Sequence, residues 1–152
     1  CLHWIPGHET LLPKLMEKLT PGGMLAVQIP LTQQAVFYKL LHELIQADKW
    51  KMLNEIHNFH NLTPNATYDV LAGCSVEVAM WETVYYHVVP SHSAVIDWYK
   101  GSGLKPYLDA LGENEKTEFL GELLEAVKGN IPIQGDGNVI LKMPRLFFTA
   151  KK

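Results

Sequence analysis

The feature that most constrains the fold is a helical pattern that ends at Pro21-Gly22-Gly23 and is followed at once by a short apolar run, Met24–Ile29. The run is nearly continuous, as is typical of strands that are covered on both faces of a sheet. A helix, a tight turn and a buried strand together make one unit of a parallel α/β sheet. The sequence therefore predicts a strand over Met24–Pro30 in such a sheet.

Very little of the chain precedes this unit. We interpret Cys1–Pro6 as the end of a strand and a turn, and His8–Leu19 has apolar residues at helical spacing. We expect that the sheet is entered partway through, so that the chain is the later half of a larger enzyme. The expected organisation is one truncated C-terminal domain over residues 1–152, with a helical insertion at about 32–74.

The remaining patterns are mixed. Val76–Val89 alternates like a strand, and Asn114–Lys128 has the apolar face of an amphipathic helix. Val139–Ala150 closes the chain as a further strand, in which Met143-Pro144 indicates a bulge or a sheet edge. Thr32 is expected to cap the helix that follows it.

Composition excludes several classes. The 152 residues are 47% apolar and 19% charged, as in a globular protein, and a net charge of −3 argues against a nucleic-acid partner. No apolar run reaches about 18 residues, so we expect no membrane contact. Two cysteines make no disulfide framework, which favours a cytoplasmic location. His42, His57 and His60 have no acidic cluster beside them, and we expect no metal site.

Five stretches resemble the trans-aconitate methyltransferase family, whose members are class I S-adenosylmethionine-dependent enzymes. Cys1–His8 resembles the segment after the fourth strand of that family, and Leu19–Pro30 resembles its helix, Gly-Gly turn and fifth strand. Three more specific stretches follow in the order of the family: Trp81–His87, Lys100–Leu108 and Met143–Ala150.

The resemblance implies an α/β, Rossmann-like fold. Class I methyltransferases order their strands 3-2-1-4-5-7-6 with strand 7 antiparallel, and this chain would hold strands 5, 6 and 7 with a helical cap. The Gly-rich turn and the acidic residue that bind S-adenosyl-L-methionine in the family are not in the sequence. Gly101-Ser-Gly103 and Gly135-Asp-Gly137 do not replace them, because neither follows a buried strand and opens a helix. We therefore expect no binding of this cofactor by the chain alone.

The implied activity is S-adenosylmethionine-dependent carboxyl O-methylation of a small polycarboxylate such as trans-aconitate, in the intact enzyme and not in this chain alone. A polycarboxylate is already ionised near neutral pH. The enzyme therefore has to orient it, exclude water and balance its charge, without a catalytic acid or base. No catalytic residue is assigned.

Five residues are candidates for substrate binding. Arg145 is the only arginine and stands at the interrupted strand, where a side chain can be turned toward a pocket. Lys105, where the family commonly has arginine, and Tyr107 follow a Gly-rich break. Tyr85 and Tyr86 are possible donors on opposite faces of one strand. The alternatives are a surface ion pair for Arg145, a solvated lysine and a core tyrosine in the Gly-rich segment, and cross-strand packing for the strand tyrosines.

His3 and Trp4 are candidates for cofactor binding, because ligands of open α/β sheets bind at the carboxyl ends of strands. If strand 4 is missing, the edge at Met24–Ile29 is exposed and favours self-association. Two other functions stay open: a non-catalytic binding or dimerisation module derived from the fold, and a class I methyltransferase with a different small-molecule substrate.

Overall fold

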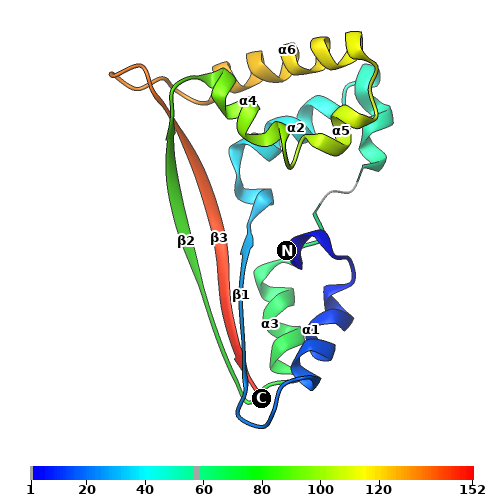
Figure 1. Cartoon of the computed structure of the whole chain (residues 1–152), viewed down its shortest axis with the longest axis vertical. Coiled ribbons are helices and arrows are strands. Elements are labelled where there is room, and N and C mark those ends of the chain that lie inside the picture. The colour runs from blue at the N-terminus through cyan, green and yellow to red at the C-terminus, as the bar shows by residue number, and fades with distance from the viewer. Residues whose placement is uncertain (1, 57–58) are drawn as a thin grey trace. The chain divides into compact units, whose positions relative to one another are not determined.

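The computed structural model describes residues 2–56 and 59–152. Three strands and a set of α-helices and 3-10 helices (η) make up the chain (Figure 1). In chain order they are η1 (Leu2–Trp4), α1 (His8–Glu17), β1 (Met24–Pro30), η2 (Thr32–Gln34), α2 (Val36–Ile45), η3 (Asp48–Glu55), α3 (Pro64–Ala72), β2 (Glu77–Val89), α4 (His92–Lys100), α5 (Lys105–Asp109), α6 (Glu113–Asn130) and β3 (Val139–Lys151).

The three strands form one sheet in the order β1-β3-β2. β1 and β3 are antiparallel, in a register that runs from Met24 opposite Lys151 to Pro30 opposite Arg145. This order is that of strands 5, 7 and 6 of the class I sheet, with the antiparallel strand in the middle. The expected neighbourhood of β1 and β3 is confirmed.

β1 has the predicted bounds, but the expectation that both of its faces are covered is wrong for the described chain. Met24 is exposed, and Ile29 is the only residue of the strand that is fully buried. Ile29 joins a core with Leu12 and Met16 of α1, so one face of the strand packs against that helix. The near-continuous apolar run predicted a second covering layer that the described residues do not supply.

Pro21-Gly22-Gly23 forms the tight turn that the sequence predicts. Gly22 has a φ of 77°, which favours glycine, and a Cβ at Gly23 would lie 2.9 Å from the carbonyl oxygen of Thr20. The Gly22 N–H donates to the Lys152 carbonyl (3.0 Å), and the Lys152 N–H donates to the Gly23 carbonyl (2.9 Å). These bonds fasten the turn to the end of β3.

The prediction of a bulge or edge at Met143-Pro144 is wrong: β3 is continuous and lies in the middle of the sheet. The reason is where Pro144 stands along the ladder. The Leu31 N–H donates to the Pro144 carbonyl (3.0 Å), so the backbone nitrogen and the carbonyl of Pro144 both face Leu31. Leu31 is the first residue after the end of β1. The proline therefore costs the sheet no ladder bond within β1.

Two local predictions are corrected at helix starts. Cys1 lies outside the described residues, and Leu2–Trp4 is a 3-10 helix rather than a strand end. Thr32 lies in η2, and α2 begins after Ala35 without a side-chain cap. Thr63 and Ser91 are true caps, since their hydroxyls accept from the Ala66 and Ala94 N–H groups at 3.2 and 3.1 Å.

The chain divides into two compact units, which we describe separately; the single domain over residues 1–152 stays a prediction. Unit 1 comprises residues 1–32, 59–85 and 144–152, and unit 2 comprises residues 33–58 and 86–143. In unit 1, α1 and α3 lie side by side (Figure 1) over a core centred on Met16, Leu71 and Phe148. None of the described helices is long and apolar enough to span a membrane.

Unit 2 is a helical assembly in which α6 packs against α2 and α4. Its core is rich in aromatic rings. Phe37 and Tyr99 are stacked with ring centroids 3.7 Å apart, and Trp50 meets Phe119 edge to face at 5.1 Å. The region predicted as a helical insertion at about 32–74 contains η2, α2, η3 and α3.

Candidate functional site

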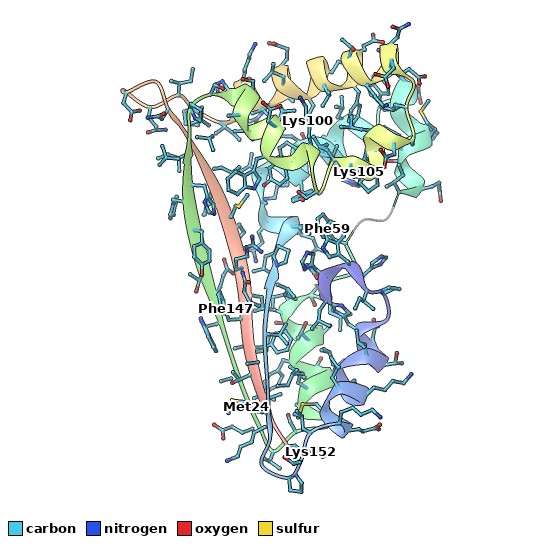
Figure 2. All side chains as sticks on the ribbon, viewed as in Figure 1. Met24, Phe59, Lys100, Lys105, Phe147 and Lys152 are labelled. Carbon is cyan, nitrogen blue, oxygen red and sulfur yellow. The ribbon has the colours of Figure 1, made fainter. Side chains whose placement is uncertain are left out.

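An aromatic cluster in unit 1 stands beside the carboxyl end of β1. The ring centroids of Trp4 and Phe59 are 4.8 Å apart, and those of His3 and Phe59 are 5.7 Å apart with nearly parallel planes. Figure 2 shows Phe59 next to η1, which carries His3 and Trp4. Trp4 remains 41% exposed, so the cluster has an accessible side.

The segment after Phe59 ties η1 to the end of β1. The His60 N–H donates to the His3 carbonyl (3.0 Å), and Asn61 Nδ2 donates to the carbonyl of Pro30 (2.6 Å). Pro30 is opposite Arg145 in the β1–β3 ladder. Residues from three distant parts of the sequence therefore meet where β1 ends, which is the end of a strand at which open α/β sheets bind ligands.

Two buried side-chain atoms at this place have no hydrogen-bond partner: Nδ1 of His3 and Oδ1 of Asn61. They are the only such side-chain atoms among the described residues. Because most buried polar groups in folded proteins are paired, each exception calls for an explanation. Polar groups of a ligand are one kind of partner that could pair them.

The electrostatics of His3 favour a neutral ring. Burial lowers the pKa of His3 to about 4, and the positive charges of the N-terminal ammonium and then of Arg145 contribute in the same direction. At neutral pH the site therefore combines one permanent cation with an uncharged imidazole. His8 Nε2 lies 2.9 Å from the Leu2 carbonyl oxygen and holds η1 against the start of α1.

The structure brings three of the predicted site residues together. His3, Trp4 and Arg145 belong to unit 1 and surround the end of β1 as described above. Tyr85 belongs to the same unit, on β2, and is 42% exposed. Their ligand roles stay predictions.

The other candidates lie in unit 2, where local contacts occupy Lys105 and Tyr107. The Lys105 ammonium pairs with Asp109 at 2.7 Å (Figure 2 labels Lys105). The Tyr107 hydroxyl donates weakly to the Ile56 carbonyl (3.4 Å), and burial raises the pKa of that phenol. Tyr86 is 64% exposed. A Cβ at Gly103 would overlap the hydroxyl of Tyr38, so a side chain of the protein fills the space beside this glycine.

Sequence reasoning missed Phe59 and Asn61. No periodicity marks either residue, and the contact of Asn61 with Pro30 joins positions 31 residues apart. A possible signal was the position of Phe59–Asn61 in a stretch without helix or strand, since binding residues are frequent in loops. Within residues 2–56 and 59–152 no group of three or more metal-binding side chains is assembled, and His57 lies outside these ranges.

Comparison with known proteins gives consistent results. No family model matches the chain. The trans-aconitate 2-methyltransferase of Klebsiella pneumoniae (strain 342) is 39% identical over 151 residues, and that of Escherichia coli O157:H7 (strain EC4115 / EHEC) is 37% identical over 152 residues. The trans-aconitate 2-methyltransferase of Methylobacterium radiotolerans is 35% identical over 158 residues.

Each alignment covers 99% of this chain and 58%, 59% and 60%, respectively, of the relative. The chain therefore spans less than two thirds of the length of these proteins. The similarity agrees with the strand order 5-7-6, which was expected from the resemblance and is observed. The chain is a homologue of the trans-aconitate 2-methyltransferases, and its three strands correspond to a part of the class I methyltransferase sheet.

Proposed function

We propose that this chain is the C-terminal portion of an S-adenosylmethionine-dependent carboxyl O-methyltransferase that acts on a small polycarboxylate such as trans-aconitate. The observation that carries the proposal is the similarity over 99% of the chain to proteins named for that reaction. The site at the end of β1 supports it, because a lone arginine and unpartnered buried polar atoms suit an anionic, hydrogen-bonding ligand.

The residues of this chain would bind and orient the substrate. S-adenosylmethionine, when bound, supplies an electrophilic methyl group on a sulfonium. The Arg145 guanidinium would hold a carboxylate of the substrate with two parallel hydrogen bonds and fix the direction of its oxygens. Trp4 and Phe59 would keep water from the reacting carboxylate. No residue has to remove a proton, because the carboxylate is already ionised at neutral pH.

The residues present fit one part of the methyl donor. His3 Nδ1 and Asn61 Oδ1 are buried and unpartnered at a strand end, as expected of groups that meet a polar ligand. Neither Gly-rich stretch fits its amino-acid and ribose groups. Gly101–Gly103 follows α4, and Gly135–Gly137 lies in the turn between α6 and β3. This chain would therefore supply contacts from one side only, and we expect no binding of S-adenosylmethionine by residues 1–152 alone.

The test is methyl transfer from tritiated S-adenosylmethionine by the complete gene-encoded protein. We expect a labelled, base-labile ester with trans-aconitate or a related tricarboxylate. If no ester forms with any of these acids, the proposed carboxyl methyltransferase activity is excluded. Labelling of another class of acceptor would favour a different class I enzyme. Calorimetric titration of residues 1–152 should give no heat of S-adenosylmethionine binding.

We also propose that residues 1–152 self-associate through β1. β1 is at one edge of the described sheet, and its outer backbone groups over Met24–Ile29 can pair with another strand. Sedimentation of this chain should show dimers or larger species, and the complete protein should show fewer. A monodisperse monomer of residues 1–152 would contradict the proposal.

A further inference from the structure

We propose that Asn61 is a ligand-contacting residue of the same site. Its Oδ1 would accept a hydrogen bond from a hydroxyl or ammonium group of a bound molecule that also carries a carboxylate, which Arg145 would hold. The inference rests on the proposed function and extends it to a residue outside the stretches that carry the family resemblance.

The first argument is the fixed orientation of the amide. Asn61 Nδ2 donates to the Pro30 carbonyl at 2.6 Å. A carbonyl oxygen can only accept, so the nitrogen of the amide must face Pro30 and the oxygen must face elsewhere. Oδ1 is buried and has no partner among the described residues. The described residues therefore hold an acceptor in place without bonding to it.

The second argument is chemical selectivity. An amide oxygen accepts hydrogen bonds and cannot donate them, so it attracts a donor and disfavours a carboxylate. The N–H of the preceding residue, His60, is already bonded to the His3 carbonyl at 3.0 Å. The carboxylate is left to Arg145, which lies opposite Pro30 in the ladder. The acceptor and the cation would thus bind two different groups of one ligand.

The third argument is the surroundings. Phe59 stands two residues before Asn61, and its ring packs on that of Trp4 with centroids 4.8 Å apart. Apolar neighbours lower the local dielectric and strengthen a hydrogen bond that forms there. Of the molecules of the proposed reaction, the methyl donor has the required pair of groups, an ammonium beside a carboxylate, at its amino-acid end. trans-Aconitate has no hydroxyl, so an acceptor would meet Oδ1 only if it is a hydroxylated polycarboxylate.

The experiment compares Asn61→Leu with the wild type in the complete protein. Calorimetry is run with three probes: S-adenosylhomocysteine, citrate, which has a hydroxyl, and tricarballylate, which lacks it. The control is Thr63→Ala, which removes the cap of α3 two residues away and leaves Asn61 intact. Asn61→Ala is the second variant if the leucine fails to fold, as checked by circular dichroism.

Loss of one hydrogen bond in this setting should weaken binding about tenfold. A loss confined to S-adenosylhomocysteine assigns the contact to the methyl donor, and a loss confined to citrate assigns it to the acceptor. Thr63→Ala should change each affinity less than twofold. The proposal is overturned if the Asn61 variants bind all three probes like the wild type, if Thr63→Ala loses as much as they do, or if the wild type binds none.

These results are separate from the test of the reaction. A wild type that binds a probe through Asn61 but transfers no methyl group would refute the proposed function and leave the contact standing. If the wild type forms the ester and the Asn61 variants bind and react normally, the proposed function stands and the contact of Asn61 is refuted.

Discussion

The two units differ in how they treat buried polar groups. In unit 2 such groups bond within the unit: His92 Nε2 lies 2.7 Å from the Ile131 carbonyl oxygen, and Trp50 Nε1 donates to Glu122 at 2.7 Å. In unit 1, His3 Nδ1 and Asn61 Oδ1 have no partner in the described structure. Because an unpaired buried polar atom is costly, the described part of unit 1 bears a cost that a further hydrogen-bonding partner would relieve.

The hydrophobic cores show the same contrast. Unit 2 buries Phe37, Trp50 and Phe119 almost completely within one core. The core of unit 1 is smaller and mostly aliphatic, with Phe148 as its buried aromatic residue, and two other aromatic residues of the unit, Trp4 and Trp81, remain 41% and 48% exposed. The difference suggests that substitutions in unit 2 act on stability and that substitutions at the end of β1 act on binding.

The largest effect is expected from Phe119→Ala in unit 2. This side chain is fully buried and meets Trp50 edge to face, so its truncation should lower the free energy of unfolding by about 3–5 kcal/mol. Urea unfolding of the complete protein measures the change. Ile133→Ala, at a position 60% exposed, is the control and should stay within about 0.5 kcal/mol. A similar small loss for both variants would contradict the contrast between the cores.

The second effect is expected from Arg145→Gln in unit 1. If the guanidinium holds a substrate carboxylate, its loss should raise the KM for trans-aconitate roughly 10- to 100-fold, with a change in unfolding free energy below about 1 kcal/mol. The control is Lys142→Gln, which removes an exposed cation from the same strand. Equal losses of binding and stability at Arg145 would assign it a structural role.

The third effect is a pH dependence from His3. The pKa of His3 is lowered from 6.5 to about 4 by burial, with smaller contributions from the N-terminal ammonium and then from Arg145. The unfolded chain therefore binds more protons between these values, so stability is fully present above about pH 6.5 and is lost as pH falls toward 4. Discounted for partial exposure, the loss should be about 1–2 kcal/mol.

His3→Phe should flatten this slope while keeping a ring against Phe59. His42→Gln, which removes an exposed histidine of unit 2, is the control. Urea unfolding at pH 4.5, 5.5 and 7 measures the effect. A slope that persists in His3→Phe would show that other groups cause it.

The strands of the sheet could be predicted from the sequence because the local sequence patterns agree with the strand pairing that the structure shows. Pro21-Gly22-Gly23 and the apolar run after it fix β1, and the alternation over Val76–Val89 fixes β2. The strand order came from the resemblance, since no residue pattern states which strands are neighbours. At Pro144 the expectation that a proline marks a bulge or a sheet edge was wrong. That expectation assumes a lost ladder bond, and β1 ends one residue before the position where the bond would form.

The site was only partly accessible. His3 and Trp4 were placed at the end of a strand by their position in a family-like segment, and the structure puts them in a 3-10 helix beside the end of β1 instead. Asn61 could not be found, because its importance lies in a bond to a carbonyl 31 residues away. Thr32 was wrongly predicted to cap α2. The 3-10 helix η2 separates Thr32 from the start of α2, and a hydroxyl close to a helix in sequence does not show that such a turn intervenes.

The smallest effect is expected at Lys105 in unit 2. Its ammonium is exposed and already pairs with Asp109 one helical turn away, a contact worth at most about 0.5 kcal/mol. Lys105→Gln should therefore leave stability almost unchanged. If Lys105 also attracts a substrate carboxylate, KM for trans-aconitate should rise about threefold, because an exposed charge in high dielectric contributes little.

Lys100→Gln is the matched control, since Lys100 forms a similar exposed pair with Asp97 at 2.7 Å (Figure 2 labels both lysines). Steady-state kinetics of the two variants at low and physiological ionic strength separate the cases. A rise in KM that is confined to Lys105→Gln and shrinks with added salt would extend the binding surface beyond unit 1. Identical KM values for the two variants would leave Lys105 as a solvated ion pair and confine the substrate cation to Arg145.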